Sequence, residues 1–149
     1  MDTITEEMKK KLSAPLPPEA ISQHPTKTFL SSIKGIYITE RLNDVFGVGA
    51  WTTKVEKVGD YRGEKADKNG TFPTMVVIKT TLEIPAYGVY YESYGGNDNA
   101  DVGDAYKGAT TDAISKIGSY MGIGADVYKG KGKKASKGVE DVEGVPFEI

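Results

Sequence analysis

The sequence has no cysteine and a single histidine, His24, among its 149 residues. Without thiols the chain cannot form disulfides, thiolate zinc sites or cysteine nucleophiles, and one histidine excludes paired motifs such as H-E-x-x-H. No apolar run approaches the ~20 residues of a membrane-spanning helix, and the polar first residues do not resemble a signal peptide. We therefore expect a soluble intracellular domain without redox chemistry.

An excess of one charge is also missing, because the formal net charge is -2. Strong duplex binders usually show a clear basic excess. The charges are separated only at the C-terminus, where a lysine-rich block, 129–138, is followed by an acidic block, 139–149. This order is typical of a tail rather than of a folded element.

The glycine-rich signatures of nucleotide-binding and hydrolytic enzymes are absent, including G-x-x-x-x-G-K-[ST], G-x-G-x-x-G and G-x-S-x-G. A loop beginning at Asn97 has oxygen ligands at calcium-loop positions 1, 3 and 5, but Gly108 stands where a bidentate Glu is needed. The spacing favours a polar loop that caps the next helix. The alternative is a carboxylate metal site made by Asp98, Asp101 and Asp104.

Helix and strand patterns follow one another along the chain. They predict a short helix at 5–12 with a proline-rich arm, a helix at 34–46, strands at 51–58, 74–84 and 89–94, and a long helix at 101–121. For residues 29–33 the pattern is compatible with either the start of the helix or a short strand. Asp101 is the expected N-cap of the long helix and Gly122 its C′ residue. The glycines inside that helix suggest close approach of a strand or a neighbouring subunit.

These elements predict an α+β fold: a three-stranded antiparallel β-meander packed against a long C-terminal helix (β-β-β-α), with an N-terminal helix and a proline-rich arm. We divide the chain into an N-terminal arm, 1–27, one domain, 28–128, and a flexible basic-then-acidic tail, 129–149.

Tyrosines are abundant and crowd the third predicted strand. Tyr90 and Tyr94 share one face and Tyr87 and Tyr91 the other, so the first pair could stack on bases. The alternative is that at least half of these tyrosine rings pack beneath a helix or against another subunit and do not contact bases. The basic residues Lys107 and Lys116 project off the apolar stripe of the long helix, where they could meet phosphates or solvent.

Three collinear segments resemble the Rad-fifty-two family of recombination and single-strand annealing proteins, in its phage and bacterial branch. They are the proline-rich lead-in L-S-A-P-L-P-P-E-A-I (12–21), the helix end R-L-N-D-V-F-G before Trp51, and K-G-A-T-T-D-A-I-S-K-I-G-S-Y-M-G-I-G (107–124). The resemblance implies a β-β-β-α unit that assembles into rings or arcs. It also implies single-stranded DNA in a basic outer groove, no cofactor and a cytoplasmic location in a bacterium or a phage-infected cell.

The resemblance transfers the family's site residues only in part. Lys107 matches the basic residue before T-D, and Arg41 the arginine of the phage-type helix. Of three basic positions after T-D, one is kept as Lys116, while Ser115 and Ser119 replace the others. The full set of predicted DNA contacts is Lys116, Lys107, Arg41, Lys79, Lys54, Tyr90, Tyr94, Lys129, Lys131 and Lys133.

The last ten residues resemble the acidic tip of bacterial single-strand binding proteins, which ends in P-F and docks on repair enzymes. Val145, Pro146 and Phe147 are therefore the predicted contacts to a repair or replication protein. A disordered solubilising tail is the alternative.

The favoured interpretation is a non-enzymatic, homo-oligomeric protein that binds single-stranded DNA and anneals it in recombination and repair. Two alternatives stay open at this point. One is a metal-dependent nuclease, or a nuclease subunit, using the three aspartates named above. The other is an interaction module that recruits partners without touching DNA.

Overall fold

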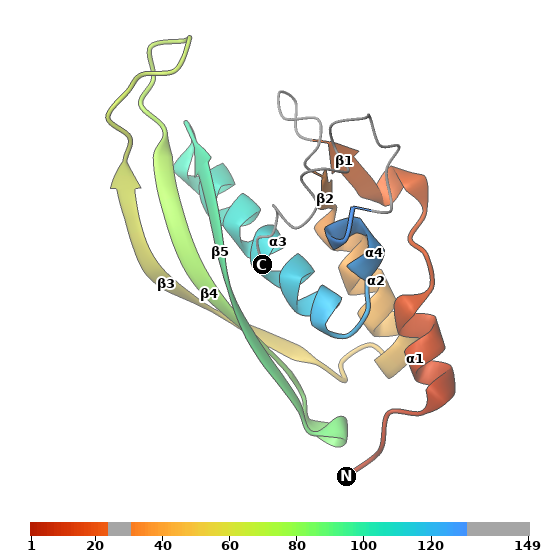
Figure 1. Ribbon diagram of the computed structural model, residues 1–149. Coiled ribbons are helices and arrows are strands. Elements are labelled where there is room, and N and C mark those ends of the chain that lie inside the picture. The colour runs from red at the N-terminus through yellow and green to blue at the C-terminus, as the bar shows by residue number, and fades with distance from the viewer. Residues whose placement is uncertain (24–30, 131–149) are drawn as a thin grey trace.

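The computed structural model describes residues 1–23 and 31–130 (Figure 1). Its elements are α1 (Glu6–Ser13), η1 (Pro18–Ala20), β1 (Ile21–Gln23), β2 (Ser31–Ile33), α2 (Gly35–Phe46), β3 (Thr52–Arg62), β4 (Thr74–Ile84), η2 (Pro85–Tyr87), β5 (Val89–Asn99), α3 (Val102–Tyr120) and α4 (Ala125–Tyr128). Over this part of the chain, no helix has the length and apolarity needed to cross a bilayer.

The main sheet is the predicted antiparallel meander, in the order β3-β4-β5. β4 alternates in period two, so that its even-numbered residues face α3 and its odd-numbered residues face the other way. The even-numbered set is fully or almost fully buried: Val76, Ile78, Thr80, Leu82 and Ile84. The α3 side is called the inner face below, and the opposite side, which carries exposed Tyr90 and Tyr94, the outer face.

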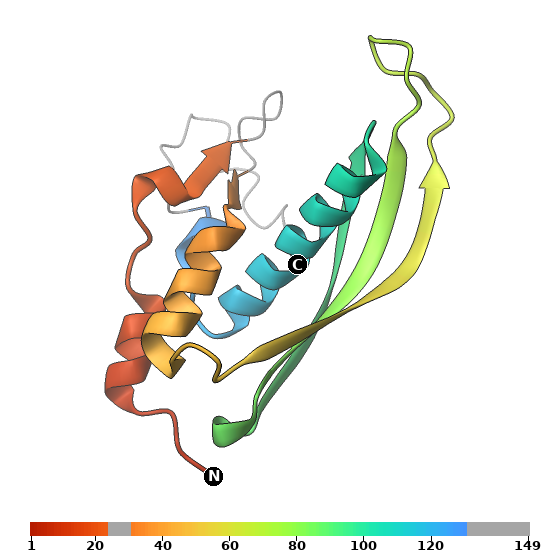
Figure 2. The same ribbon diagram turned by 180° about the vertical axis from the view of Figure 1, so that it is seen from behind.

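α3 lies across the inner face of β4 and β5 (Figures 1 and 2). It packs there through a stripe of small residues. Ala105, Ala109 and Ala113 are all fully buried there. At Gly95 of β5 the helix comes so close that an added Cβ would collide with the Ala109 carbonyl. Helix and strand backbones therefore come closest at a glycine of the strand. The prediction that the glycines inside the helix mark this approach was wrong, since Gly103, Gly108 and Gly118 lie against the side chains of Asp101, Asn97 and Ile38.

The second half of α3 joins a separate core of large aliphatic residues beneath α1, α2 and α4. Its members include Leu12, Ile38, Leu42, Ile117 and Ile123. Gly122 has a φ of 98°, in the left-handed region, as expected for the C′ residue of α3. Asp101 caps the other end by accepting a hydrogen bond from the Asp104 N–H at 3.0 Å.

Several element bounds differ from the predicted ones. β3 continues to Arg62 and β5 to Asn99, beyond the predicted ends at 58 and 94, because both pair with the full length of β4. A β-bulge between Lys57 and Gly59 lets β3 continue past the expected loop. The segment left open at 29–33 contains β2, which pairs with β1, and α4 was not predicted.

The division into arm, domain and tail stays a prediction. Lys131 and Lys133, and the tip residues Val145, Pro146 and Phe147, lie outside the described residues.

Candidate nucleic-acid interface

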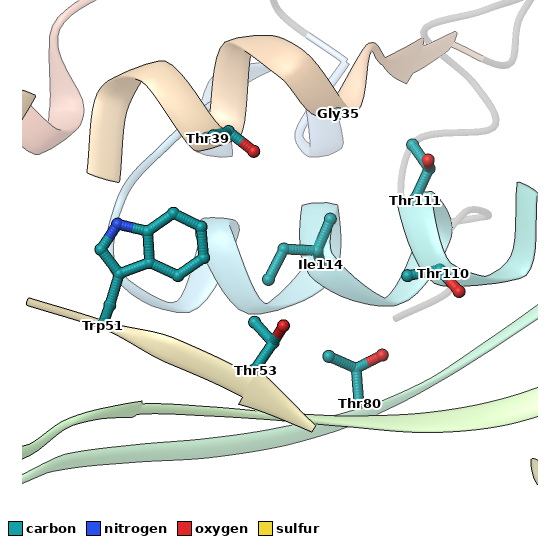
Figure 3. Close-up of a pocket in the computed structure, with 8 residues that line it drawn as sticks. All are labelled: Gly35, Thr39, Trp51, Thr53, Thr80, Thr110, Thr111 and Ile114. Atoms are coloured by element: carbon teal, nitrogen blue, oxygen red, sulfur yellow. The ribbon is translucent and has the colours of Figure 1, made fainter. Parts of the chain in front are cut away.

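A cleft of about 230 Å³ opens between α2, α3 and the inner face of the sheet (Figure 3). We call it the threonine cleft, since five of its eight lining residues are threonines. They come from four elements and one loop: Gly35, Thr39, Trp51, Thr53, Thr80, Thr110, Thr111 and Ile114. Among the described residues that line it, none is charged.

Some polar groups of the cleft are hydrogen-bonded within the protein, and one is not. Trp51 Nε1 donates to Asn43 Oδ1 at 2.8 Å, which holds the indole at the cleft wall. The Thr110 hydroxyl donates to the Tyr106 carbonyl at 2.8 Å, so its oxygen can only accept from a ligand. Thr80 Oγ1 is buried and has no partner among the described residues. A buried hydroxyl without a partner costs free energy, so this position is a place to look for a ligand or a water.

Beyond the cleft the inner face of β3 is largely uncovered, because α3 packs on β4 and β5. On this face Val55 is 47% exposed and Lys57 is also exposed. Farther along β3 the Tyr106 hydroxyl donates to Asp60 Oδ2 at 2.9 Å, which joins α3 to β3. This hydrogen bond and the ion pair with Lys57 at 3.1 Å lower the pKa of Asp60.

Two exposed lysines adjoin residues of the cleft. Lys107 lies one turn before Thr110 and Thr111 on α3, its side chain is 83% exposed, and its contact with Asp104 is long, at 3.9 Å. Lys34 is the exposed N-cap residue of α2, directly before Gly35. Both ammonium groups are therefore available to a ligand that lies along the cleft.

Lys116 lies on the opposite side of α3, at the free edge of β5. Its Nζ donates to the Tyr94 carbonyl at 3.3 Å and to Asp112 Oδ2 at 3.1 Å, and its side chain is only 22% exposed. The same Asp112 oxygen accepts the Gly96 N–H at 3.1 Å. Lys116 and Asp112 thus satisfy edge groups of β5, which gives Lys116 a structural role that helical spacing alone did not reveal.

Arg41 also has a structural environment. Its guanidinium donates to the carbonyls of Lys11, Leu12 and Ala14 at 2.8–2.9 Å and to that of Pro15 at 3.4 Å. These carbonyls lie in the last turn of α1 and directly after it, so the arginine holds α1 against α2. We therefore leave Arg41 out of the candidate interface.

Four other predicted contacts, Lys54, Lys79, Tyr90 and Tyr94, lie on the outer face, away from the cleft. Lys79 stands between Glu92 at 3.4 Å and Glu56 at 3.8 Å, and these two carboxylates, with Glu92 the stronger influence, raise its pKa. The Tyr90 hydroxyl donates to Glu92 at 2.8 Å. Lys54 and Tyr94 are exposed on the same face, and Lys129 is exposed at the end of α4.

Packing within the protein, the alternative to base stacking for the four crowded tyrosines, is found for two of them. Tyr87 packs edge-on against Phe46 with ring centroids 5.3 Å apart, and Tyr91 packs against Tyr120 at 5.6 Å. The outer pair, Tyr90 and Tyr94, keeps more than half of its surface exposed.

The aspartates of the nuclease alternative do not converge. Asp98 belongs to β5, while Asp101 is occupied as the cap of α3. Within residues 1–23 and 31–130, no group of three acidic, histidine or cysteine side chains is arranged to hold a metal ion.

The sequence analysis missed the cleft itself. Its threonines are scattered between positions 39 and 111 and form no local motif, so only the packing of four elements brings them together. Trp51 was noticed as part of a resemblance and not as a ligand contact, although a lone indole next to a helix end is a signal worth following.

No curated protein matches the chain. The model of the Rad52/22 family of double-strand break repair proteins matches residues 5–145, which includes every described element. The chain therefore belongs to the Rad52/22 double-strand break repair family.

Proposed function

We propose that this protein binds single-stranded DNA and anneals complementary strands during recombination and repair, as a homo-oligomer and without enzymatic chemistry. The observation that carries the proposal is the threonine cleft beside the uncovered inner face of β3, in a member of a double-strand break repair family. A small cleft with an aromatic wall and few cations suits a flexible single strand better than a duplex.

The distribution of cations supports a modest electrostatic contribution. Lys107 and Lys34 flank the cleft, while Lys116, Lys79 and Arg41 are engaged with protein groups. Phosphate contacts therefore come from few lysines in each subunit, so that a long strand needs several subunits to be held firmly. This is the physical reason for proposing an oligomer.

The test is an annealing assay with two complementary labelled oligonucleotides, in EDTA and without ATP, followed by energy transfer. We expect annealing faster than the spontaneous rate, together with light scattering that gives a multiple of the 16.1 kDa chain. Absence of acceleration would refute annealing. Activity that disappears on chelation and returns with magnesium would instead support the nuclease alternative.

A further inference from the structure

The chemistry of the threonine cleft is unusual for a surface that contacts only phosphates. Its described lining contains hydroxyls, an indole and an isoleucine but no charged group. Phosphates are normally held by cations, backbone N–H groups or helix N-termini. A neutral lining with both donors and acceptors suits a neutral ligand that can donate and accept hydrogen bonds.

The shape of the cleft adds a second restriction. Its volume of about 230 Å³ is below the roughly 300–1,000 Å³ of sites for drug-sized molecules, so it suits a single ring system. Trp51 forms one wall, fixed by its hydrogen bond to Asn43, and Ile114 lies on the α3 side (Figure 3). A planar ring can therefore stack on the indole without displacing it.

The third observation is the unpartnered hydroxyl at the floor. The Thr80 side chain is only 1% exposed, its Oγ1 has no partner among the described residues, and it points toward the cleft in Figure 3. A ligand that reached this oxygen would remove the cost of leaving it unpaired. The other threonine oxygens would fix the orientation of the ring.

We infer that the threonine cleft accepts one unstacked nucleobase of the bound single strand, with its ring against Trp51 and its edge toward the threonine hydroxyls. This inference rests on the proposed function. It gives the protein a binding position for a base, in addition to the lysines that contact the phosphates of the DNA. Lys34 and Lys107 would then contact the phosphates on either side of the inserted base.

The experiment uses Trp51 as the reporter, since it is the single tryptophan of the chain. Binding of a 5′-labelled oligothymidylate and of an abasic phosphodiester of equal length is measured by anisotropy of the label. Trp51 emission is recorded in parallel with unlabelled strands. We expect both strands to bind, but only the base-containing strand to change the emission, and to bind about fivefold more tightly or better.

Two adjacent threonines give a matched pair of variants. Thr53 lies on the inner face and lines the cleft, whereas Thr52 lies on the outer face of the same strand, and both are exposed. Thr53→Phe should fill the cleft and lower the affinity for oligothymidylate to that for the abasic strand. Thr52→Phe should leave both affinities and the emission response unchanged. Aromatic residues are well tolerated in strands, so both variants are expected to fold.

A second pair tests the buried hydroxyl. Thr80→Val keeps the shape of the floor and removes Oγ1, so the base-dependent part of the affinity should fall severalfold while abasic binding stays the same. Thr81→Val, on the outer face, is its control.

The outcomes separate the inference from the proposed function. If neither strand changes the anisotropy, both are overturned. If both strands bind equally well and leave Trp51 emission unchanged, DNA binding stands and the base position is overturned. Emission that changes with protein concentration in the absence of DNA would assign the cleft to a side chain of another subunit, which also overturns the inference.

Discussion

The two edge strands of the main sheet have opposite relations to α3. β5 lies directly under the helix, with Gly95 against its backbone and Lys116 and Asp112 bonded to the strand edge. β3 is exposed along most of its length and is joined to the helix at its far end through Tyr106 and Asp60. The helix thus covers the inner face at β5 and leaves it uncovered at β3.

This asymmetry shows that the charge of a residue does not tell its role. Lys116 and Lys107 are nine positions apart on the same helix, and both are predicted DNA contacts. One contacts protein oxygens and the other solvent, because the helix leans toward β5 and away from β3. Substitutions on the two sides should therefore act on different properties: stability on the β5 side and ligand binding on the β3 side.

The largest effect is expected for Gly95→Ala. The new Cβ would collide with the backbone of Ala109 and Ala113, so helix and strand would have to separate. Overpacking of this kind costs about 1–3 kcal/mol, and contact with backbone puts this site at the upper end of that range. Urea unfolding measures the loss. The control is Gly59→Ala on β3, where nothing lies within 4 Å of an added Cβ and stability should be nearly unchanged.

Lys116→Ala should lower the free energy of unfolding by about 1 kcal/mol, since it removes hydrogen bonds to Tyr94 and Asp112 from a largely covered side chain. The salt dependence of DNA binding should not change in the folded variant. Thermal unfolding together with binding at several salt concentrations checks both points. A reduced salt slope with unchanged stability would return Lys116 to the DNA interface, where the sequence pattern had put it.

Lys107→Ala should show the reverse behaviour. Its side chain is 83% exposed, so stability should stay within about 0.5 kcal/mol of the parent. If Lys107 neutralises one phosphate, the slope of log K against log salt for single-stranded DNA should fall by about 0.7. Lys54→Ala, on the outer face, is the matched control and should leave the slope unchanged. Equal losses in the two variants would mean that DNA does not distinguish the two faces.

The strands and the long helix could be predicted because their signals are local. The period of two in 74–84 and the cap at Asp101 need no knowledge of the rest of the chain. The end of β5 could not be predicted in this way. Gly95, Gly96 and Asn97 have the composition of a turn, and pairing with Ile78, Val77 and Val76 overrides that local preference.

The candidate site was harder to predict than the strands, because it is formed by residues that are distant in the sequence. Whether a lysine on a helix meets solvent or a strand carbonyl is decided by how closely the two elements pack, and spacing along the helix gives no information on that distance. The threonine cleft likewise exists because α2 and α3 both stop short of covering β3. The segments that resemble the family include α3 and Trp51, but they give no information on which side of the helix faces β3.

The smallest effect concerns the hydrogen bond that joins α3 to β3. The Tyr106 hydroxyl is the largest cause of the lowered pKa of Asp60, ahead of Lys57. A lowered carboxyl pKa stabilises the folded state above the unfolded-state value of about 3.9, and this contribution is lost as the pH falls toward the folded-state pKa. Carbon-detected NMR titration of the Asp60 carboxyl should therefore show a pKa that rises in Tyr106→Phe, and by more than in Lys57→Met. If Tyr106→Phe leaves this pKa in place, the hydrogen bond between α3 and β3 does not form in solution.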